Sequence, residues 1–501
     1  MRRLALSFAF SLLMAGGAFA QTNLRIGLAE DPDVLDPTLA RTYVGRIVFA
    51  SLCDKLFDID ENLKIVPQLA LSHETSADGK TVIIKLRPNV KFHDGEPFDA
   101  AAAKFSLDRH LTLTGSVRKP ELSSLESVDV VDPLTIKLNL KAPFSPLMAQ
   151  LTDRAGMMMA PKATAEAGDK FGLHPVCAGP YKFVERVPQD RIVVEKFADY
   201  WDKDHVFIDK ITYQPIVDGT VRLANLRSGS LDLIERVLAT DIKTVRDDPK
   251  LKLSKAVSLG YLGLMENVGN GPKADTPFGK DARVRQALEL SLDRDAINQA
   301  VFNGEFVPGN QWVSPQNFYY QKAFPIPKRD VAKAKTLLQQ AGVKPPVTLD
   351  FLVPNGPENR AVAEVVQSMA AEAGFDLKIR VTEFTTSIKE TENGNFQLSL
   401  FGWSGRADPD GNAFIIQTCK AGLNYGKYCD KAVDALHDQA RAATDPAERK
   451  KIYEKIAAKV LPEGDFIYLY HPQVLIAHSD KLEGYRPMPD GLVRVIGLKL
   501  K

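Results

Sequence analysis

The segment from Gly402 to Asn412, GWSGRADPDGN, gathers residue types that could do chemistry: a tryptophan, a serine, an arginine and two aspartates among three glycines. Its first five residues approach the Gly-x-Ser-x-Gly turn of serine hydrolases, but Arg406 replaces the second glycine that this sharp turn requires. The run that starts at Asp408 begins like a calcium loop, yet its twelfth position is Cys419 instead of a bidentate glutamate. The segment therefore fits neither a serine nucleophile nor a calcium site.

The same segment fits the floor of a binding cleft, because it follows a predicted strand at 396–403 and open α/β sheets bind ligands beyond their strand ends. Trp403 offers an apolar plane, Arg406 offers a planar fork for an anion, and Asp408 can orient that guanidinium. A competing interpretation places Trp403 in the core and pairs Arg406 with Asp408 or Asp410. We expect Arg406, Trp403 and Asp408 to form part of a ligand site.

No other motif positively indicates catalysis or a metal centre. The eight histidines are scattered, and none has a zinc-like partner three to five residues along the chain. The triplet at 79–81, Gly-Lys-Thr, resembles the end of a phosphate-binding loop, but Glu74 stands where the first glycine is required. A hairpin turn is the better interpretation. Paired carboxylates of the glycosidase type are not excluded by sequence, although nothing points to them.

The chain opens with the pattern of a secretory signal peptide at residues 1–20. Two arginines precede an apolar run, and small residues ending in Ala20 give an A-x-A cleavage site before Gln21. The apolar run is shorter than the roughly 20 residues that span a bilayer, and no cysteine stands at the cleavage point for a lipid anchor. We therefore expect a soluble periplasmic protein.

Charge and cysteine content restrict the partners and the compartment. The 64 basic and 63 acidic residues give a formal net charge of +1, which falls to about −1 once the two signal-peptide arginines are removed. This balance indicates neither a nucleic-acid partner nor an anionic membrane surface. Four cysteines in an oxidising compartment predict two disulfides. Cys419 and Cys429 bracket a short polar loop, while Cys53 and Cys177 form the second predicted pair, with buried free thiols as the alternative.

The first half of the mature chain reads as mixed strands and helices. A strand is predicted at 22–29, a helix with one apolar face over 44–57, and a hairpin over 71–86 around an Asp78-Gly79 turn. Asp99 is a predicted helix N-cap. A mature chain of about 480 residues exceeds what one core supports, so at least two domains are expected.

The second half follows a β-α-β pattern. Helices are predicted at 284–302 (two short helices), 331–343 and 359–373, and strands at 347–353, 377–384 and 396–403. Such alternation favours a sheet with parallel strands, so we expect an α/β domain over roughly residues 265 to 470. The stretch FIYLYHPQVLIAHS then alternates like a strand and is expected to return to the first domain.

Several segments, in this order, resemble a known family. They are LAEDPDVLDP, IVPQLALSHETSADGKTVIIKLRPNVKFHDGEPFDA, CAGPYKF, FADYW, DARVRQALELSLDRDAI and GWSGRADPDGN. Together they resemble the family 5 extracellular solute-binding proteins of bacterial peptide ABC importers, whose members bind dipeptides, oligopeptides, glutathione or nickel. The resemblance covers the whole mature chain.

The resemblance implies an α/β, two-lobed periplasmic binding protein fold of type II, cluster C-like, with an inserted subdomain. Lobe I is expected at 21–262 plus 476–501, its insert at about 62–185, and lobe II at 263–475. Two strand-like crossings, LGYLGLMEN and YLYHPQVLI, fit a hinge between the lobes.

The resemblance also implies ligand contacts, and here the sequence departs from the dipeptide binders. Those members carry Asp where this chain has Arg406, and Arg where it has Asn355, with Arg360 a few residues on. The altered charges favour a carboxylate-bearing or otherwise anionic solute, such as a modified peptide, a glutathione-like compound or an opine. Tyr43 and Asn424 complete the predicted ligand-binding set.

The function expected from this resemblance is non-enzymatic capture of a peptide or peptide-like solute and its delivery to membrane permease subunits. We expect no cofactor and a monomer. Two alternatives stay open at this point: a secreted hydrolase, and a nickel-binding or haem-binding protein with the same fold.

Overall fold

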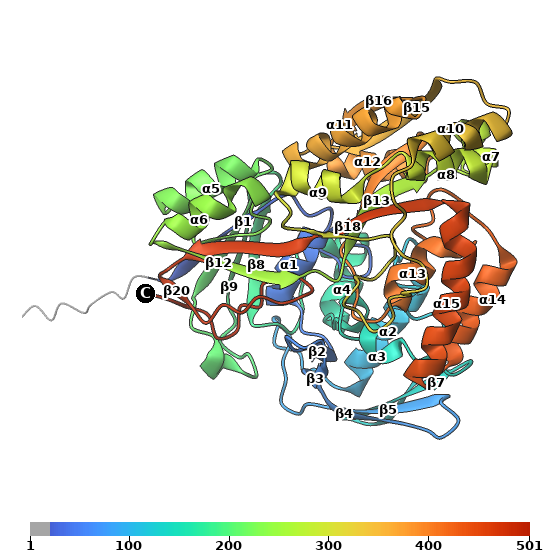
Figure 1. Ribbon diagram of the computed structural model, residues 1–501. Helices are drawn as coiled ribbons and strands as arrows, with labels where there is room; N and C mark the ends of the chain where they lie inside the picture. Colours follow the sequence, from blue (N-terminus) through green and yellow to red (C-terminus); the bar gives the residue numbers. More distant parts are fainter. Residues whose placement is uncertain (1–20) are drawn as a thin grey trace, which may run out of the picture.

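The computed structural model describes residues 21–501, and the predicted signal peptide at 1–20 lies outside them (Figure 1). Within the described part, helices and strands are grouped around a seven-stranded sheet, a six-stranded sheet and a four-stranded sheet. The protein therefore has the mixed α/β architecture that the sequence predicts.

The seven-stranded sheet is assembled from residues near both ends of the described chain. Its strands, in spatial order, are β12 (Leu251–Val257), β19 (Gln473–Ser479), β11 (Leu233–Ile234), β1 (Asn23–Leu28), β10 (Lys210–Pro215), β9 (Arg191–Lys196) and β8 (Tyr181–Val187). The central strand β1 runs parallel to β10 and β11, and the remaining neighbours are antiparallel. The carboxyl ends of β1, β10 and β11 consequently meet at one edge of the sheet.

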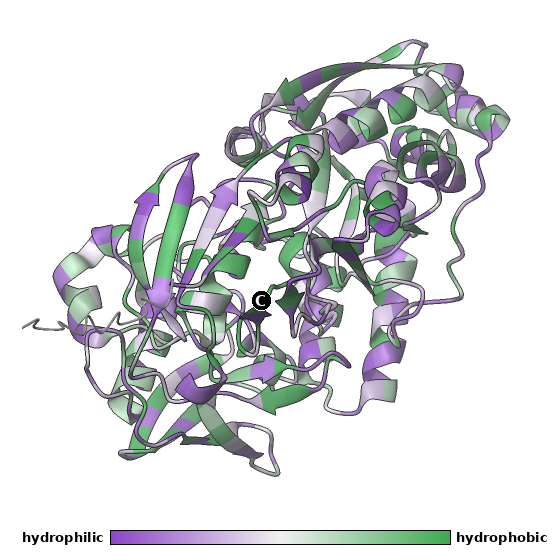
Figure 2. Ribbon diagram, turned by 90° about the vertical axis from the view of Figure 1, so that its left-hand side faces the viewer, coloured by the Kyte–Doolittle hydropathy of each residue, from purple (hydrophilic) through white to green (hydrophobic). Residues whose placement is uncertain are grey.

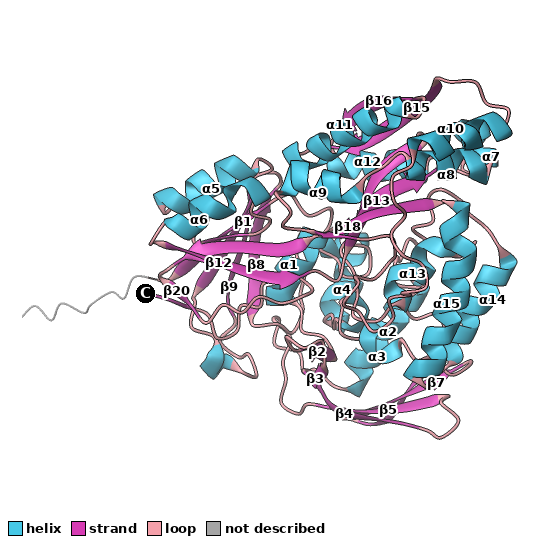
Figure 3. Cartoon of the chain, viewed as in Figure 1, coloured by secondary structure: helices cyan, strands magenta, loops and turns pink. Residues whose placement is uncertain are grey.

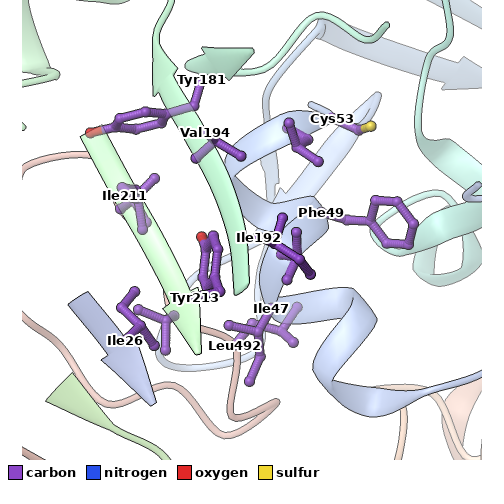
Figure 4. Packing of buried hydrophobic residues seen from close by; sticks show 14 of the residues in the cluster. Ile26, Ile47, Phe49, Cys53, Tyr181, Ile192, Val194, Ile211, Tyr213 and Leu492 are labelled. Carbon is purple, nitrogen blue, oxygen red and sulfur yellow. The ribbon is translucent and has the colours of Figure 1, made fainter. Parts of the chain in front are cut away.

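Helix α1 (Tyr43–Leu52) packs its apolar face against this sheet. Ile47 of the helix lies in the same buried cluster as Ile26 of β1 and Tyr213 of β10 (Figure 4). This packing confirms the amphipathic helix that the sequence spacing predicts. Two further helices, α5 (Gly219–Ser228) and α6 (Ile242–Asp247), belong to the same part of the chain (Figure 1).

A disulfide joins the end of α1 to the segment before β8. Cys53 and Cys177 are bonded with their Cα atoms 4.9 Å apart, which confirms the predicted pair. Cys53 has an extended backbone, with φ −129° and ψ 104°. The helix therefore ends at Leu52, although its apolar spacing predicts that it continues to Leu56.

Between these two cysteines the chain builds an antiparallel sheet with a core of its own. Its strands, in spatial order, are β4 (Ala70–Thr75), β5 (Thr81–Leu86), β7 (Thr135–Leu140) and β6 (Leu125–Asp132). The β4–β5 pair confirms the predicted hairpin. Helix α2 (Ala100–Thr112) begins after Asp99, whose carboxylate accepts a hydrogen bond from Ala102 N at 2.9 Å, as the N-cap prediction requires. The boundaries of the predicted insert stay a prediction.

Short elements complete this region and the C-terminal end of the chain. They are β2 (Phe57–Ile59), β3 (Ile65–Pro67), α3 (Leu147–Gln150), α4 (Pro161–Ala167), β20 (Leu482–Glu483) and β21 (Lys499–Leu500).

The six-stranded sheet contains the predicted β-α-β units. Its strands, in spatial order, are β14 (Val307–Pro308), β18 (Phe466–His471), β13 (Tyr261–Glu266), β17 (Leu398–Trp403), β15 (Val347–Pro354) and β16 (Phe375–Thr382). Strand β15 is parallel to both β16 and β17, which confirms the expected parallel arrangement. Helices accompany these strands, namely α7 (Pro277–Lys280), α8 (Ala282–Leu290), α9 (Arg294–Phe302), α10 (Val331–Gln340), α11 (Pro357–Glu372) and α12 (Phe384–Glu392). In Figure 2 the helices alternate between hydrophobic and hydrophilic residues, as expected for helices with one packed face.

Three helices near the C-terminus form a further layer. They are α13 (Asp410–Gln417), α14 (Lys431–Ala442) and α15 (Pro446–Glu463), and Figure 3 shows α14 and α15 side by side. The loop between α13 and α14 carries the second disulfide, in which the Cα atoms of Cys419 and Cys429 are 4.4 Å apart. This bond confirms the other predicted pair.

The chain passes twice between the two large sheets. It leaves the seven-stranded sheet after β12, enters the six-stranded sheet at β13, and returns between β18 and β19 at Pro472. The stretch expected as one returning strand is therefore two strands in two sheets. At the first crossing a Cβ on Gly260 would lie 2.2 Å from the carbonyl oxygen of Trp403, so this close backbone approach requires glycine.

Candidate functional site

A cavity of about 700 Å³ lies between the two large sheets. Its lining includes residues that directly follow parallel strands of both sheets: Glu30 and Asp31 after β1, Glu235 and Arg236 after β11, Asn355 after β15, Glu383 after β16 and Ser404 after β17. Ligands of open α/β sheets bind beyond the carboxyl ends of the strands, and the volume falls within the roughly 300–1,000 Å³ of small-ligand pockets. The cavity is the candidate binding site.

Aromatic side chains supply much of its apolar wall: Tyr43, Tyr261, Phe306, Phe401, Trp403, Tyr425 and Tyr470. Trp403 is held in place because its indole Nε1 donates to Gly411 O at 3.0 Å and to Asn412 Oδ1 at 3.1 Å. Tyr43 is fixed by a hydrogen bond from its hydroxyl to Gly491 O at 2.6 Å. Two of these rings are therefore oriented by hydrogen bonds within the protein.

One part of the lining is acidic and is organised by Arg236. The guanidinium lies 3.0 Å from Glu30 Oε1 and 3.3 Å from Glu235 Oε2, and it covers the ring of Tyr43 at 5.0 Å. Arg236 has φ 50°, a left-handed conformation that is costly for a residue with a side chain and that recurs at functional sites. Burial raises the pKa of Glu358, on the opposite wall, to about 7. Charge in this region is therefore sensitive to pH near neutrality.

Arg406 lies outside the cavity lining and is 6 % exposed. Its Nε is 2.7 Å from Asp153 Oδ2, and its Nη1 donates to Gly405 O at 2.7 Å. Asp153 also lies 3.2 Å from Nε of Arg46. The interpretation of Arg406 as a ligand anchor needs correction, because its guanidinium is committed to an internal carboxylate.

Asp408 does not orient Arg406 either. Its carboxylate accepts from Nη2 of Arg449 at 2.7 Å, and Asp410 accepts from Nε of Arg441 at 2.7 Å. The competing interpretation is therefore wrong about the partner of Arg406, which is neither Asp408 nor Asp410, whereas Trp403 does pack against a buried cluster, as that interpretation expects. Those two aspartates have arginines of their own, both on the C-terminal helices.

Asn424 is a structural residue of the disulfide loop. It is 3 % exposed and lies outside the cavity lining. Its amide donates to Thr418 O at 2.9 Å and its Oδ1 accepts from Tyr428 N at 3.1 Å, so its polar groups are already used. Asn355, by contrast, is exposed and lines the cavity at the end of β15. Tyr43, Trp403 and Asn355 are thus the predicted contacts that the fold brings together.

Comparison with known proteins identifies the family of this chain. The family described as bacterial extracellular solute-binding proteins, family 5 middle, matches residues 64–425. A glutathione-binding protein GsiB from Pectobacterium atrosepticum is 31% identical over 492 residues, covering 96% of this chain and 94% of the relative. This chain belongs to the family 5 solute-binding proteins.

Solved structures agree with this assignment. The binding protein AgaA in complex with agropinic acid, from A. tumefaciens R10, is 27% identical, with a TM-score of 0.87 and coverage of 96% of this chain and 99% of that one. DppA from Helicobacter pylori, in complex with the peptide STSA, has a TM-score of 0.88 at 22% identity over 96% and 98% of the two chains, a likeness of fold alone. The family 5 protein therefore has the periplasmic binding protein fold expected from its sequence.

Sequence reasoning missed the residues that give this family 5 protein its charged lining. Arg118, Glu121 and Arg154 line the cavity, as do Glu235 and Arg236. The last two follow the short strand β11 directly, so a search of strand ends could have found them. Nothing in the sequence marks the first three, because only tertiary packing brings their segments to the cavity.

Two further observations concern the described residues of this solute-binding protein. Residues 21–501 contain no group of three or more His, Cys, Asp or Glu side chains placed to hold a metal ion. No helix in the same part of the chain is both long enough and apolar enough to cross a membrane.

Proposed function

We propose that this solute-binding protein captures a small peptide-like, carboxylate-bearing solute in the cavity between its sheets, in the periplasm, and delivers it to the permease subunits of an ABC importer. The cavity itself carries the proposal: its volume suits a small ligand, and strand ends of both large sheets face it. The relative GsiB is named as a glutathione-binding protein, and AgaA holds agropinic acid. Both support a carboxylate-bearing ligand.

Capture requires that two lobes open and close, and we propose that each lobe is built on one large sheet. The expected bounds of 21–262 plus 476–501 and of 263–475 then shift by a few residues, to the crossings before β13 and at Pro472. Two short crossings support a hinge, since such crossings absorb the backbone rotation of domain closure. An ion pair between Arg41 and Glu392 spans the proposed lobes beside the cavity, and Arg41 itself lines it.

Ligand contacts are proposed for Tyr43, Trp403 and Asn355. The two rings offer fixed apolar surfaces, and the exposed amide of Asn355 offers a donor and an acceptor. No reacting side chain is assigned, and we propose that the protein acts as a monomeric binder and not as an enzyme.

Calorimetric titration with glutathione and with a panel of dipeptides and tripeptides tests this function. Gly402→Phe is the informative variant, because Gly402 lines the cavity and a Cβ there meets only Leu262, at 3.7 Å. The phenyl group then occupies ligand space, and we expect binding to weaken at least about a hundredfold, or about 2.7 kcal/mol.

The matched control places the same ring on the outer surface, as Lys243→Phe, where the native side chain is 85% exposed. This variant should bind as the wild-type protein does. Small-angle scattering at saturating ligand should show a smaller radius of gyration. Equal affinity of the Gly402→Phe and wild-type proteins would contradict the assignment of the site to this cavity.

A further inference from the structure

The two crossings between the large sheets are short and lie side by side. The first consists of residues 258–260, between β12 and β13, and the second is Pro472 alone, between β18 and β19. A backbone hydrogen bond joins them on the side of the seven-stranded sheet, from Ser258 N to Pro472 O at 3.1 Å. Because proline has no N–H, Pro472 cannot return a second bond. The backbone pairing resumes only at Leu262 and Tyr470, in the six-stranded sheet.

The side chain of His471 bridges this interruption. Its Nδ1 lies 2.8 Å from Gly260 O, so the last residue of β18 is bonded to the last residue of the first crossing. A carbonyl oxygen only accepts hydrogen bonds, and Nδ1 must therefore carry the proton. The two crossings are thus joined at both ends, by a backbone bond at Ser258 and by an imidazole at Gly260.

The imidazole of His471 is enclosed by backbone. The residue is fully buried, and a Cβ on Gly309 would lie only 2.4 Å from its Nε2. Gly309 is itself held beside β18, because its N–H donates to Leu469 O at 3.1 Å. Only a glycine leaves space for the ring at this point, so the fold makes room for the imidazole next to Gly260.

Burial also keeps this histidine neutral at neutral pH. It lowers the pKa of His471 to about 4, although the bond to Gly260 O opposes the shift. Nε2 then bears a lone pair, and it is buried without a hydrogen-bond partner among residues 21–501. The single N–H of the neutral ring points to Gly260 O, so no ring donor is left without an acceptor.

The first crossing supports a wall of the cavity. A Cβ on Gly260 would lie 2.2 Å from Trp403 O, and a Cβ on Gly405 would lie 2.2 Å from Leu259 O. The backbone that carries Trp403 therefore rests directly on residues 259 and 260. Both crossings contribute residues to the cavity lining, as Trp403 does. A change in the geometry of the crossings is consequently felt in the ligand space.

We propose that His471 is a positioning residue for solute capture: its Nδ1–H, bonded to Gly260 O, couples the two crossings and so holds the wall that carries Trp403. The proposal rests on the proposed function, since a coupled hinge matters to a cleft that closes on its ligand. Bending is confined to the few residues between the bond at Ser258 and the bond at Gly260. A hinge ordered before binding loses less conformational freedom when the solute is captured.

Two variants break the coupling in different ways. His471→Leu removes the donor, whereas Gly309→Ala keeps the imidazole and displaces it, because the added methyl group would overlap Nε2. His471→Asn keeps an N–H donor on a shorter side chain and should restore part of the coupling. The matched control is His437→Leu, since His437 is also fully buried with one unbonded ring nitrogen, but lies on α14 and bonds Gln417.

Hydrogen exchange of the unliganded protein, followed by mass spectrometry, measures the coupling without a ligand. Exchange of residues 258–262 should be at least about tenfold faster in His471→Leu and Gly309→Ala than in wild type, because an uncoupled segment opens more often. His471→Asn should fall between them and wild type. His437→Leu should leave this segment within about twofold of wild type, even if the variant melts earlier.

Histidine NMR spectra provide a second readout that needs no ligand. The ring whose signals vanish in His471→Asn should be the Nδ1–H tautomer at neutral pH. A proton on Nε2 of this ring, or unchanged exchange of residues 258–262 in both His471→Leu and Gly309→Ala, would overturn the coupling.

Titration with glutathione and with the peptide panel tests the effect on capture. Affinity should fall at least about tenfold in His471→Leu and Gly309→Ala and stay within about twofold of wild type in His437→Leu. Affinity within about twofold of wild type in the first two variants would overturn the positioning role of His471 and leave the proposed function standing. If no probe binds wild-type protein while exchange still rises in both variants, the coupling stands and the proposed ligand class fails.

Discussion

Replacement of Asp153 by asparagine tests whether the buried ion pairs of Asp153 with Arg406 and Arg46 stabilise the folded protein. The substitution keeps the shape of the side chain and removes its charge, so Arg406 and Arg46 lose the carboxylate that lies 2.7 Å and 3.2 Å away. Because Asp153 is only 4 % exposed, water cannot replace it. Removal of one partner of a buried pair typically costs about 3–5 kcal/mol, and we expect a loss of that size in the free energy of unfolding.

Urea denaturation at pH 7 in chloride buffer measures this loss as a shift of the midpoint. Asp108→Asn is the control, because Asp108 pairs with Lys104 in a bridge whose side chains are 40% and 41% exposed, and exposed pairs contribute at most about 1 kcal/mol. If Asp153→Asn lowers the free energy of unfolding by less than about 1 kcal/mol, the buried ion pairs of Asp153 do not stabilise the fold as argued here.

The same variant makes a prediction about pH. Burial alone would raise the pKa of Asp153, but the charges of Arg406 and Arg46 outweigh it and hold the pKa well below its usual range. A carboxyl group with a lowered folded-state pKa stabilises the fold above its unfolded pKa of about 3.9, and this contribution is lost as pH falls through the folded value. The difference between wild type and variant should therefore be constant above about pH 5 and shrink in stronger acid.

Two other sets of variants test the account of stability. Loss of the Cys53–Cys177 disulfide should lower the free energy of unfolding by roughly 5 kcal/mol, and loss of Cys419–Cys429 by roughly 3 kcal/mol. The first loss is larger because the closed loops span sequence separations of 124 and 10 residues. Urea midpoints that rank the two variants in the opposite order would contradict this. Burial raises the pKa of Asp465 from 3.8 to about 7, so the contribution of this carboxyl group to stability should fall as pH rises from about 4 to 7. Asp465→Asn should remove about 3–4 kcal/mol of that fall, whereas an unchanged pH profile would show that Asp465 ionises normally.

Much of the fold could be predicted because local patterns agree with the final packing. The alternation at β15, β16 and β17, with helices α11 and α12 between them, predicts parallel strands, and the structure has them. The prediction of one strand through Pro472 was wrong. Each half of this stretch alternates like a strand, and only the tertiary structure assigns the two halves to different sheets. Periodicity indicates which residues are buried but not which sheet buries them.

The candidate site could be predicted only in part, for a physical reason that Arg406 illustrates. Its place after β17 and beside Trp403 suggests a ligand contact, yet the guanidinium turns to Asp153, a residue far away in the sequence. An isolated sequence cannot show such a partner. Arg118 and Arg154 are among the arginines that do line the cavity, but they carry no local motif, and only the tertiary structure brings their segments there.

Mass spectrometry of the protein isolated from the cells that produce it tests the central claim, capture of a small solute between the sheets, most directly. Denaturation of the wild-type protein should release one carboxylate-bearing solute per chain, and Gly402→Phe, with its ligand space filled, should release less than about a tenth of that amount, a difference of about 1.4 kcal/mol or more. Equal release by the two proteins, or wild-type protein that carries no solute and turns over chromogenic esters or peptides, would contradict the account.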